Sequence, residues 1–365
     1  MAVSLVATGI TFPDASIQTT RAAQVPAFTN RIINGAMVID QRNAGASVAI
    51  TSSSPYTLDR WFGFATQSSK FTVQQNAGSV TPPAGFKNYL GVTSLSAYSV
   101  GASEQFLIQQ KIEGFNCADL EWGTASAATV TLSFWVRSSL TGTFGGAIFN
   151  DAGNRSYPFS YTISAANTWE QKTITIAGDT TGTWLTTNGN GISVNFSMGI
   201  GSTLSGTAGA WAGSYLPSAT GATSVVGTNG ATFYITGVQL EKGSTATSFD
   251  YRPYGTELML CERYALLVGD GLQGQARTTS DTFLCPFFQQ PMRATPTVTM
   301  TDTSVNISDN FSANFISSGS TASQVDMTAY GGRISISGFT GLTLGRTYTA
   351  FSNTNGSVML LSAEL

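Results

Sequence analysis

Charged residues are scarce in this chain. Asp, Glu, Lys and Arg make up 10% of its 365 residues, against about 25% in an average soluble domain. Lysines and arginines are scattered singly and the net charge is −3, so no basic stripe is available for a nucleic-acid backbone. Ser, Thr, Asn and 39 glycines replace the missing charge. That mixture favours short strands joined by tight turns, because Thr suits strands while Gly, Asn and Ser suit turns.

Histidine is absent altogether. Its absence removes the most common general base, the usual Ser-His-Asp hydrolase site and the most common metal ligand. Cysteine is nearly absent as well. Cys117, Cys261 and Cys285 lie far apart and match no metal-ligand spacing, so we interpret all three as small buried side chains.

Long apolar runs and a basic leader segment are also missing. A membrane-spanning helix needs about 18–20 apolar residues, and the longest candidate, 258–268, is interrupted by Glu262 and Arg263. The first basic side chain is Arg21. We therefore expect no signal peptide and no membrane span, and we expect the protein to fold in a cytoplasm.

Strand signals dominate what is present. Between residues 60 and 250, segments rich in β-branched and aromatic residues alternate with turn residues. The candidate strands are 70–75, 104–112, 128–137, 143–149, 157–163, 170–176, 192–199 and 232–240. No helical periodicity or fixed repeat runs through them. The pattern predicts an all-β chain whose main part is an antiparallel β-sandwich of the jelly-roll kind.

The chain is predicted to divide into three parts. Residues 1–26 are a short segment with too little apolar surface to fold alone, and residues 27–255 hold the sandwich. Residues 256–365 are predicted to form a smaller β-rich domain. Within it, we interpret 257–267 as a strand rather than a helix, and the Ser- and Asn-rich stretch 301–330 as a variable loop region. The last strands are expected at 333–337, 347–352 and 357–364.

Several stretches resemble bacteriophage tail-fibre and virion proteins. TGITFPDASIQTT at 8–20 is similar to an element near the start of such fibres. NRIINGAMVIDQRNAG at 30–45 and SPYTLDRWF at 54–62 resemble the opening of their carbohydrate-binding-module-like jelly roll, and 237–258 resembles its closing block. FFQQPMRATPTVTM at 287–300 resembles a signature near their ends. The resemblance implies a virion protein that assembles in the host cytoplasm as a homotrimer.

The resemblance also implies a contact with other virion proteins through the N-terminal segment. Its candidate residues are Ile10, Phe12, Pro13 and Ile17. Jelly rolls of this kind often hold a structural calcium ion, but no compact acidic cluster indicates where one would bind. We therefore assign no cofactor and leave a metal site unassigned.

Aromatic side chains beside polar ones are the best indication of ligand binding, because the C–H faces of sugars pack on aromatic rings. Trp184, Trp211 and Tyr215 lie in Gly-, Thr- and Ser-rich stretches and are candidate exposed loop aromatics. In VTLSFWVR, strand alternation puts Trp135 and Arg137 on the face opposite the core, as an alternative platform. For each residue, packing within the protein is the competing interpretation.

These observations predict a non-catalytic virion fibre or adhesion protein that binds a bacterial surface polysaccharide. One alternative is a purely structural virion component, such as a head decoration, collar or adaptor protein. Another is a polysaccharide depolymerase, which needs paired carboxylates. The candidate carboxylates on the sandwich match no recognisable motif; they are Glu104, Glu113, Asp119, Glu121, Asp151 and Glu170.

Overall fold

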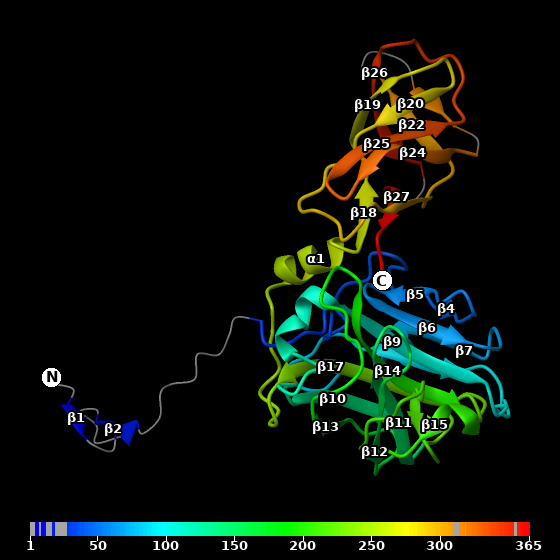
Figure 1. The fold of residues 1–365 in the computed structure, drawn as a ribbon. Helices are drawn as coiled ribbons and strands as arrows, with labels where there is room; N and C mark the ends of the chain where they lie inside the picture. Colours follow the sequence, from blue (N-terminus) through cyan, green and yellow to red (C-terminus); the bar gives the residue numbers. More distant parts are fainter. Residues whose placement is uncertain are drawn as a thin grey trace.

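The structure is a computed structural model built almost entirely of β-strands. It describes residues 28–309, 314–317, 319–353 and 356–365, together with the backbone of three short strands nearer the N-terminus. A β-sandwich forms the larger part, and a smaller β-rich module is joined to it through one helix (Figure 1). The predicted all-β class is confirmed.

Two six-stranded antiparallel sheets form the sandwich. The first sheet has the order β13-β10-β17-β8-β7-β4, with β4 Val48–Ala49, β7 Phe71–Gln75, β8 Leu90–Ser94, β10 Val130–Ser138, β13 Glu170–Ile176 and β17 Thr232–Lys242. The second sheet has the order β12-β11-β14-β9-β6-β5, with β5 Tyr56–Leu58, β6 Trp61–Ala65, β9 Gln105–Glu113, β11 Gly142–Phe149, β12 Ser156–Ile163 and β14 Asn190–Ile200. Every strand predicted between residues 70 and 240 is present.

Alternation along each strand decides which side chains enter the core. On β10, Leu132 and Phe134 are fully buried between the sheets, whereas Trp135 and Arg137 lie on the outer face and are half-buried. The predicted division of this strand into a core face and an outer face is therefore confirmed.

The chain between β14 and β17 folds back over part of the second sheet. It contains the 3-10 turn η4 Ser202–Leu204 and the short parallel strands β15 Ser205–Gly206 and β16 Ser218–Ala219. The Asn195 amide donates to Pro217 O at 2.8 Å, and Ser156 pairs with Ala212. This layer covers the β11 and β12 side of the outer face. Further 3-10 turns among the described residues are η1 Ala77–Ser79, η2 Gly114–Asn116 and η3 Ala118–Leu120.

The second module has its own hydrophobic core, which includes Leu284, Ile334 and Tyr348. One sheet has the order β18-β27-β21, with β18 Ala265–Gly269, β21 Thr297–Met300 and β27 Ser357–Ser362. The other has the order β23-β22-β26-β19-β20-β25-β24, with β19 Leu272–Ala276, β20 Asp281–Leu284, β22 Val305–Ser308, β23 Asn314–Ile316, β24 Thr321–Thr328, β25 Gly331–Ser337 and β26 Thr347–Ser352.

Two interpretations of local sequence in this module are wrong. We interpreted 301–330 as a loop region, but its described residues supply β22, β23 and β24. In β22, Val305 and Ile307 alternate with polar residues and are buried. Cys285 is exposed rather than buried. It follows Leu284, which enters the core, so alternation places the cysteine on the outer face.

The junction contains the helix α1, Tyr254–Glu262. We predicted strand from 257 onward, and the chain becomes strand only at Ala265. The Glu257 carboxylate in the first turn accepts the Asn34 N–H and faces the Arg252 guanidinium, which holds the helix start against the sandwich. In the part of the chain that the structure describes, no helix is long and apolar enough to cross a membrane.

Near the N-terminus, β1 Ser4–Val6, β2 Gly9–Thr11 and β3 Ile17–Gln18 pair as a small antiparallel sheet. The side chains of the predicted attachment residues lie outside the described residues; they are Ile10, Phe12, Pro13 and Ile17. Their role stays a prediction, and so do the predicted domain boundaries after residues 26 and 255.

Candidate functional site

A groove crosses the uncovered part of the outer face of the second sheet. Alternation on β9 sends Phe106 and Ile108 into the core, so Leu107, Gln109 and Lys111 line this face. We name the hollow the β9 groove, and it encloses about 270 Å³. Its lining residues are Ser54, Phe62, Phe64, Gln105, Leu107, Gln109, Lys111, Phe149, Asp151, Asn190, Ser193 and Tyr215.

Aromatic rings from three separate segments meet in the groove. Phe64 comes from β6 and is half-buried, and Phe149 comes from the end of β11. Tyr215, from the covering layer, packs edge-on against Phe149 with ring centroids 5.1 Å apart. Its hydroxyl donates to Gln105 Oε1 at 3.0 Å, and burial raises the pKa of Tyr215 to about 12. The hydroxyl therefore stays neutral and keeps its hydrogen bond to Gln105 at the side of the groove.

Polar groups with unused hydrogen-bonding capacity lie beside these rings. The Asn190 amide donates to Asp151 Oδ1 at 3.1 Å and to Ser193 Oγ at 3.0 Å, while its own Oδ1 is buried without a partner among the described residues. The Gln109 side chain makes no hydrogen bond to any described residue. A buried acceptor without a donor costs free energy. These polar groups of the groove suit a ligand that carries hydroxyl groups.

Lys111 supplies the positive charge of the groove. Burial lowers the pKa of its amine, an effect that Asp151 opposes. Its Nζ donates to Leu365 O at 3.1 Å. The second module therefore reaches the groove at this point.

The predicted loop aromatics separate into two groups. Tyr215 lines the groove, but Trp184 and Trp211 do not. Trp184 is 8% exposed and packs against Trp122 and Trp211 with centroids 4.7 and 5.5 Å apart. Its indole N–H faces Asp179 at 3.3 Å. The expected exposure of Trp184 is wrong, because three tryptophans pack together here, as an extension of the core.

Trp211 is half-buried at the edge of this cluster, and its indole N–H donates to Ala177 O at 2.8 Å.

Trp135 and Arg137 lie on the first sheet, on the other side of the molecule from the groove. Arg137 stands 5.3 Å from the Tyr234 ring centroid and donates to Asn167 O, which is a packing arrangement. The Trp135 side chain makes no hydrogen bond or ring contact with a described residue.

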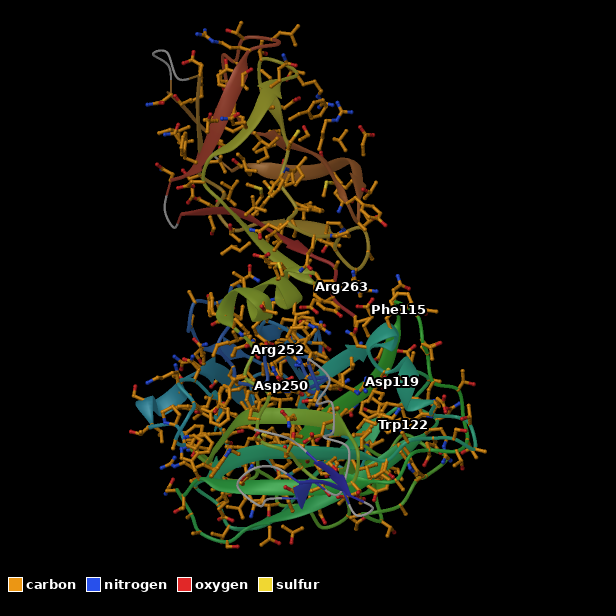
Figure 2. The ribbon with its side chains drawn as sticks, turned by 90° about the vertical axis from the view of Figure 1, so that its left-hand side faces the viewer. Phe115, Asp119, Trp122, Asp250, Arg252 and Arg263 are labelled. Carbon is orange, nitrogen blue, oxygen red and sulfur yellow. The ribbon has the colours of Figure 1, made fainter. Side chains whose placement is uncertain are left out.

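The Arg252 guanidinium occupies a space lined by oxygen atoms at the start of the sandwich. Arg252 donates to the carbonyl oxygens of Asn30 and Ile32 and lies 3.3 Å from the Glu257 carboxylate. Figure 2 shows it beside Asp250, 3.9 Å away. Carbonyl and carboxylate oxygens are the ligands that calcium prefers, and here a guanidinium pairs with them. Among the described residues, no three His, Cys, Asp or Glu side chains gather around a metal position.

Sequence reasoning missed most of the groove. The signal was present on the predicted strand 104–112, where Gln105, Leu107, Gln109 and Lys111 occupy the positions opposite Phe106 and Ile108. A largely polar row on a strand between two buried strands indicates a face that meets a ligand or water. Asp151 was noted as a carboxylate, but nothing in the sequence joined it to Asn190.

Comparison with known proteins gives distant likenesses only. No family model matches the sequence, and no curated protein matches it. The enzymatically active domain of bacteriophage CBA120 tailspike protein 4 aligns with TM-score 0.32 and 12% identity, over 59% of this chain and 22% of that chain. A putative sugar binding protein from Bacteroides thetaiotaomicron aligns with TM-score 0.34 and 12% identity, over 59% of this chain and 100% of its own. A family 11 carbohydrate-binding module from Clostridium thermocellum aligns with TM-score 0.27 and 10% identity, over 55% and 98%. Similarity this distant assigns neither a family nor a function to this chain.

Proposed function

We propose that this chain binds a carbohydrate in the β9 groove and, as part of a bacteriophage particle, attaches that particle to a bacterial surface polysaccharide. The observation that carries the binding proposal is that aromatic rings meet the unpaired Asn190 Oδ1 and the Gln109 side chain in one groove. The sequence resemblance at 30–45 and 54–62 supports the virion role, with the homotrimer and the N-terminal attachment that it implies.

Sugar rings present apolar C–H faces and polar edges, so they suit a groove of this composition. The faces would pack against Phe64 and Tyr215, and the hydroxyl groups would pair with Gln109 and the free oxygen of Asn190. Each contact contributes about 1 kcal/mol, because the sugar stays partly hydrated. One site therefore binds weakly, and firm attachment depends on several copies engaging together.

Binding is favoured over hydrolysis by the state of the nearby carboxylates. Glycoside hydrolysis uses two carboxyl groups on either side of the scissile bond. Asp151 lines the groove, whereas Glu113 is paired with Arg263 at 2.6 Å and accepts the Tyr264 hydroxyl at 2.6 Å. The alternative of a purely structural virion component differs from our proposal in one measurable respect, which is that it predicts no carbohydrate binding.

The experiment is binding of the purified protein to an array of bacterial capsular and lipopolysaccharide O-antigen polysaccharides. We expect wild type to bind at least one of them, and Gln109→Ala and Phe64→Ala each to weaken that binding about fivefold, equivalent to about 1 kcal/mol. Tyr254→Ala is the matched control, since Tyr254 is 63% exposed and does not line the groove. No binding by wild type would favour the structural role. If only Trp135→Ala lost binding, the carbohydrate site would lie on the first sheet and not in the β9 groove.

A further inference from the structure

We infer that the β9 groove recognises the end of a saccharide chain rather than its interior, because the second module closes one end of the groove. The inference rests on the proposed carbohydrate-binding function and specifies which part of a polysaccharide the groove takes.

The floor of the groove runs along β9 from Gln105 to Lys111, a distance of about 20 Å at the usual rise of a strand. At Lys111 the second module reaches the floor, because Lys111 Nζ donates to Leu365 O at 3.1 Å. The Tyr56 hydroxyl lies 3.4 Å from the same oxygen, and the Tyr56 ring packs against Phe62, a groove residue, at 5.4 Å. Leu365 therefore lies directly beyond Lys111, the last floor residue, and we name it the wall at this end of the groove.

The wall is anchored in the body of the sandwich. Glu113, the next residue of β9 on this face, is 1% exposed and paired with Arg263 from the second module. Glu364, next to Leu365, pairs with the buried Arg60 and, at 2.8 Å, with Arg42. Separating the modules would break these three ion pairs. The pairs therefore hold the segment that ends at Leu365 in place beside the groove.

Arg293 extends the wall toward the other side of the groove. Its guanidinium donates to the carbonyl oxygens of Ala363 at 2.7 Å and Glu364 at 2.6 Å, which holds the segment before Leu365 in place. The same guanidinium donates to Asn188 O at 3.1 Å, two residues before the groove residue Asn190. One side chain therefore ties the segment that follows β27 to the loop that leads into β14.

At the opposite end of the groove, Ser54, Phe64 and Gln105 are half-exposed. The hydrogen bonds of Gln105 there go to Thr66 and Tyr215, which belong to the sandwich. A saccharide chain can enter from this side and extend into solvent. Its last unit would lie against Lys111 and Leu365, where a continuing chain would meet the wall.

The test compares each polysaccharide of the array in two forms, the intact polymer and a partial acid hydrolysate of equal mass, as soluble competitors for binding of the wild-type protein. Hydrolysis multiplies chain ends and leaves the interior sequence nearly unchanged. We expect a hydrolysate with tenfold more ends to compete about tenfold better per unit mass. Equal or weaker competition by the hydrolysate overturns end recognition and leaves carbohydrate binding standing. No binding to any polysaccharide overturns the proposed function, and this inference with it.

A variant tests whether the wall causes the preference for chain ends over chain interiors. Arg293→Ala should loosen the wall and reduce the advantage of the hydrolysate at least threefold, with intact polymer competing better than it does against wild type. Arg333→Ala is the matched control, since its exposed ion pair with Asp326 lies in the second module outside the groove. An unchanged advantage in a folded Arg293→Ala protein overturns the role of the wall. If that variant does not fold, the wild-type competition decides by itself.

Discussion

Arg263 and Glu113, 150 residues apart in the sequence, form a two-point ion pair across the junction of the sandwich and the second module, with N–O distances of 2.6 and 2.9 Å. Figure 2 shows Arg263 at this junction, directly below the second module. Glu113 ends β9, whose earlier residues form the floor of the groove. The pair therefore connects the proposed binding surface to the module that closes it.

Removing Arg263 should weaken the junction. Arg263→Ala leaves the Glu113 carboxylate buried with the Tyr264 hydroxyl alone, so we expect the free energy of unfolding to fall by about 3 kcal/mol. Urea denaturation measures the change. Arg333→Ala, which breaks an exposed pair, should cost less than about 1 kcal/mol. If Arg263→Ala and Arg333→Ala lower the free energy of unfolding equally, the junction pair stabilises the protein no more than an exposed ion pair does.

The same pair should make stability depend on pH. Burial would raise the pKa of Glu113, but hydrogen bonds from Arg263 and Tyr264 outweigh it and hold the pKa below its ordinary value. A carboxyl of this kind stabilises the fold above its unfolded pKa of about 4.3, and the contribution is lost as pH falls through the lower folded value. The stability difference between wild type and Glu113→Gln should therefore be largest at neutral pH and shrink in acid. Denaturation at a series of pH values checks this, and a constant difference would contradict it.

The two kinds of tryptophan should respond differently to truncation. Trp184 is buried in the tryptophan cluster, so Trp184→Ala should cost about 3–5 kcal/mol of unfolding free energy. Trp135 is half-buried without a ring partner, and Trp135→Ala should cost less than half as much. Thermal and urea denaturation of both variants give the comparison. A Trp184→Ala protein as stable as wild type would reopen a surface role for that residue.

The Tyr215 hydroxyl should matter for binding more than for stability. Tyr215→Phe keeps the ring against Phe149 and removes the hydrogen bond that orients Gln105 in the groove. We expect affinity for the carbohydrate to fall about fivefold, the effect of one hydrogen bond of about 1 kcal/mol, with the melting temperature within a few degrees of wild type. Titration calorimetry measures the affinity, with Tyr254→Phe as the control. A large fall in melting temperature would instead identify Tyr215 as a core residue.

Deleting residues 1–26 should leave a folded protein. No residue of the described cores precedes Ile32, so the midpoint of urea unfolding should stay unchanged. We predict that the truncated protein no longer joins phage particles. Purified particles assembled in the presence of tagged full-length or truncated protein provide the readout. Normal incorporation of the truncated form would show that attachment lies elsewhere in the chain.

The strands of the sandwich could be predicted from the sequence, because the decisive information is local. In β10, apolar and polar residues alternate, and the structure buries Leu132 and Phe134 while leaving Trp135 half-exposed. A strand exposes alternate side chains to opposite faces, so this pattern needs no knowledge of distant residues. The scarcity of charge and the abundance of turn residues identified the all-β class for the same reason.

Only the tertiary structure decided where the groove lies and what closes it. Tyr215, Asn190 and Lys111 come from three segments that local pattern does not connect, and the groove exists because the sheet order brings β6, β9 and β14 together. Burial of Trp184 depends on Trp122, and the helix at Glu257 depends on Asn34. Such outcomes rest on contacts between residues far apart in sequence, whose free energy appears only when the chain has folded. The sequence by itself thus determined the strands and their faces, and the packing of the two modules determined the site.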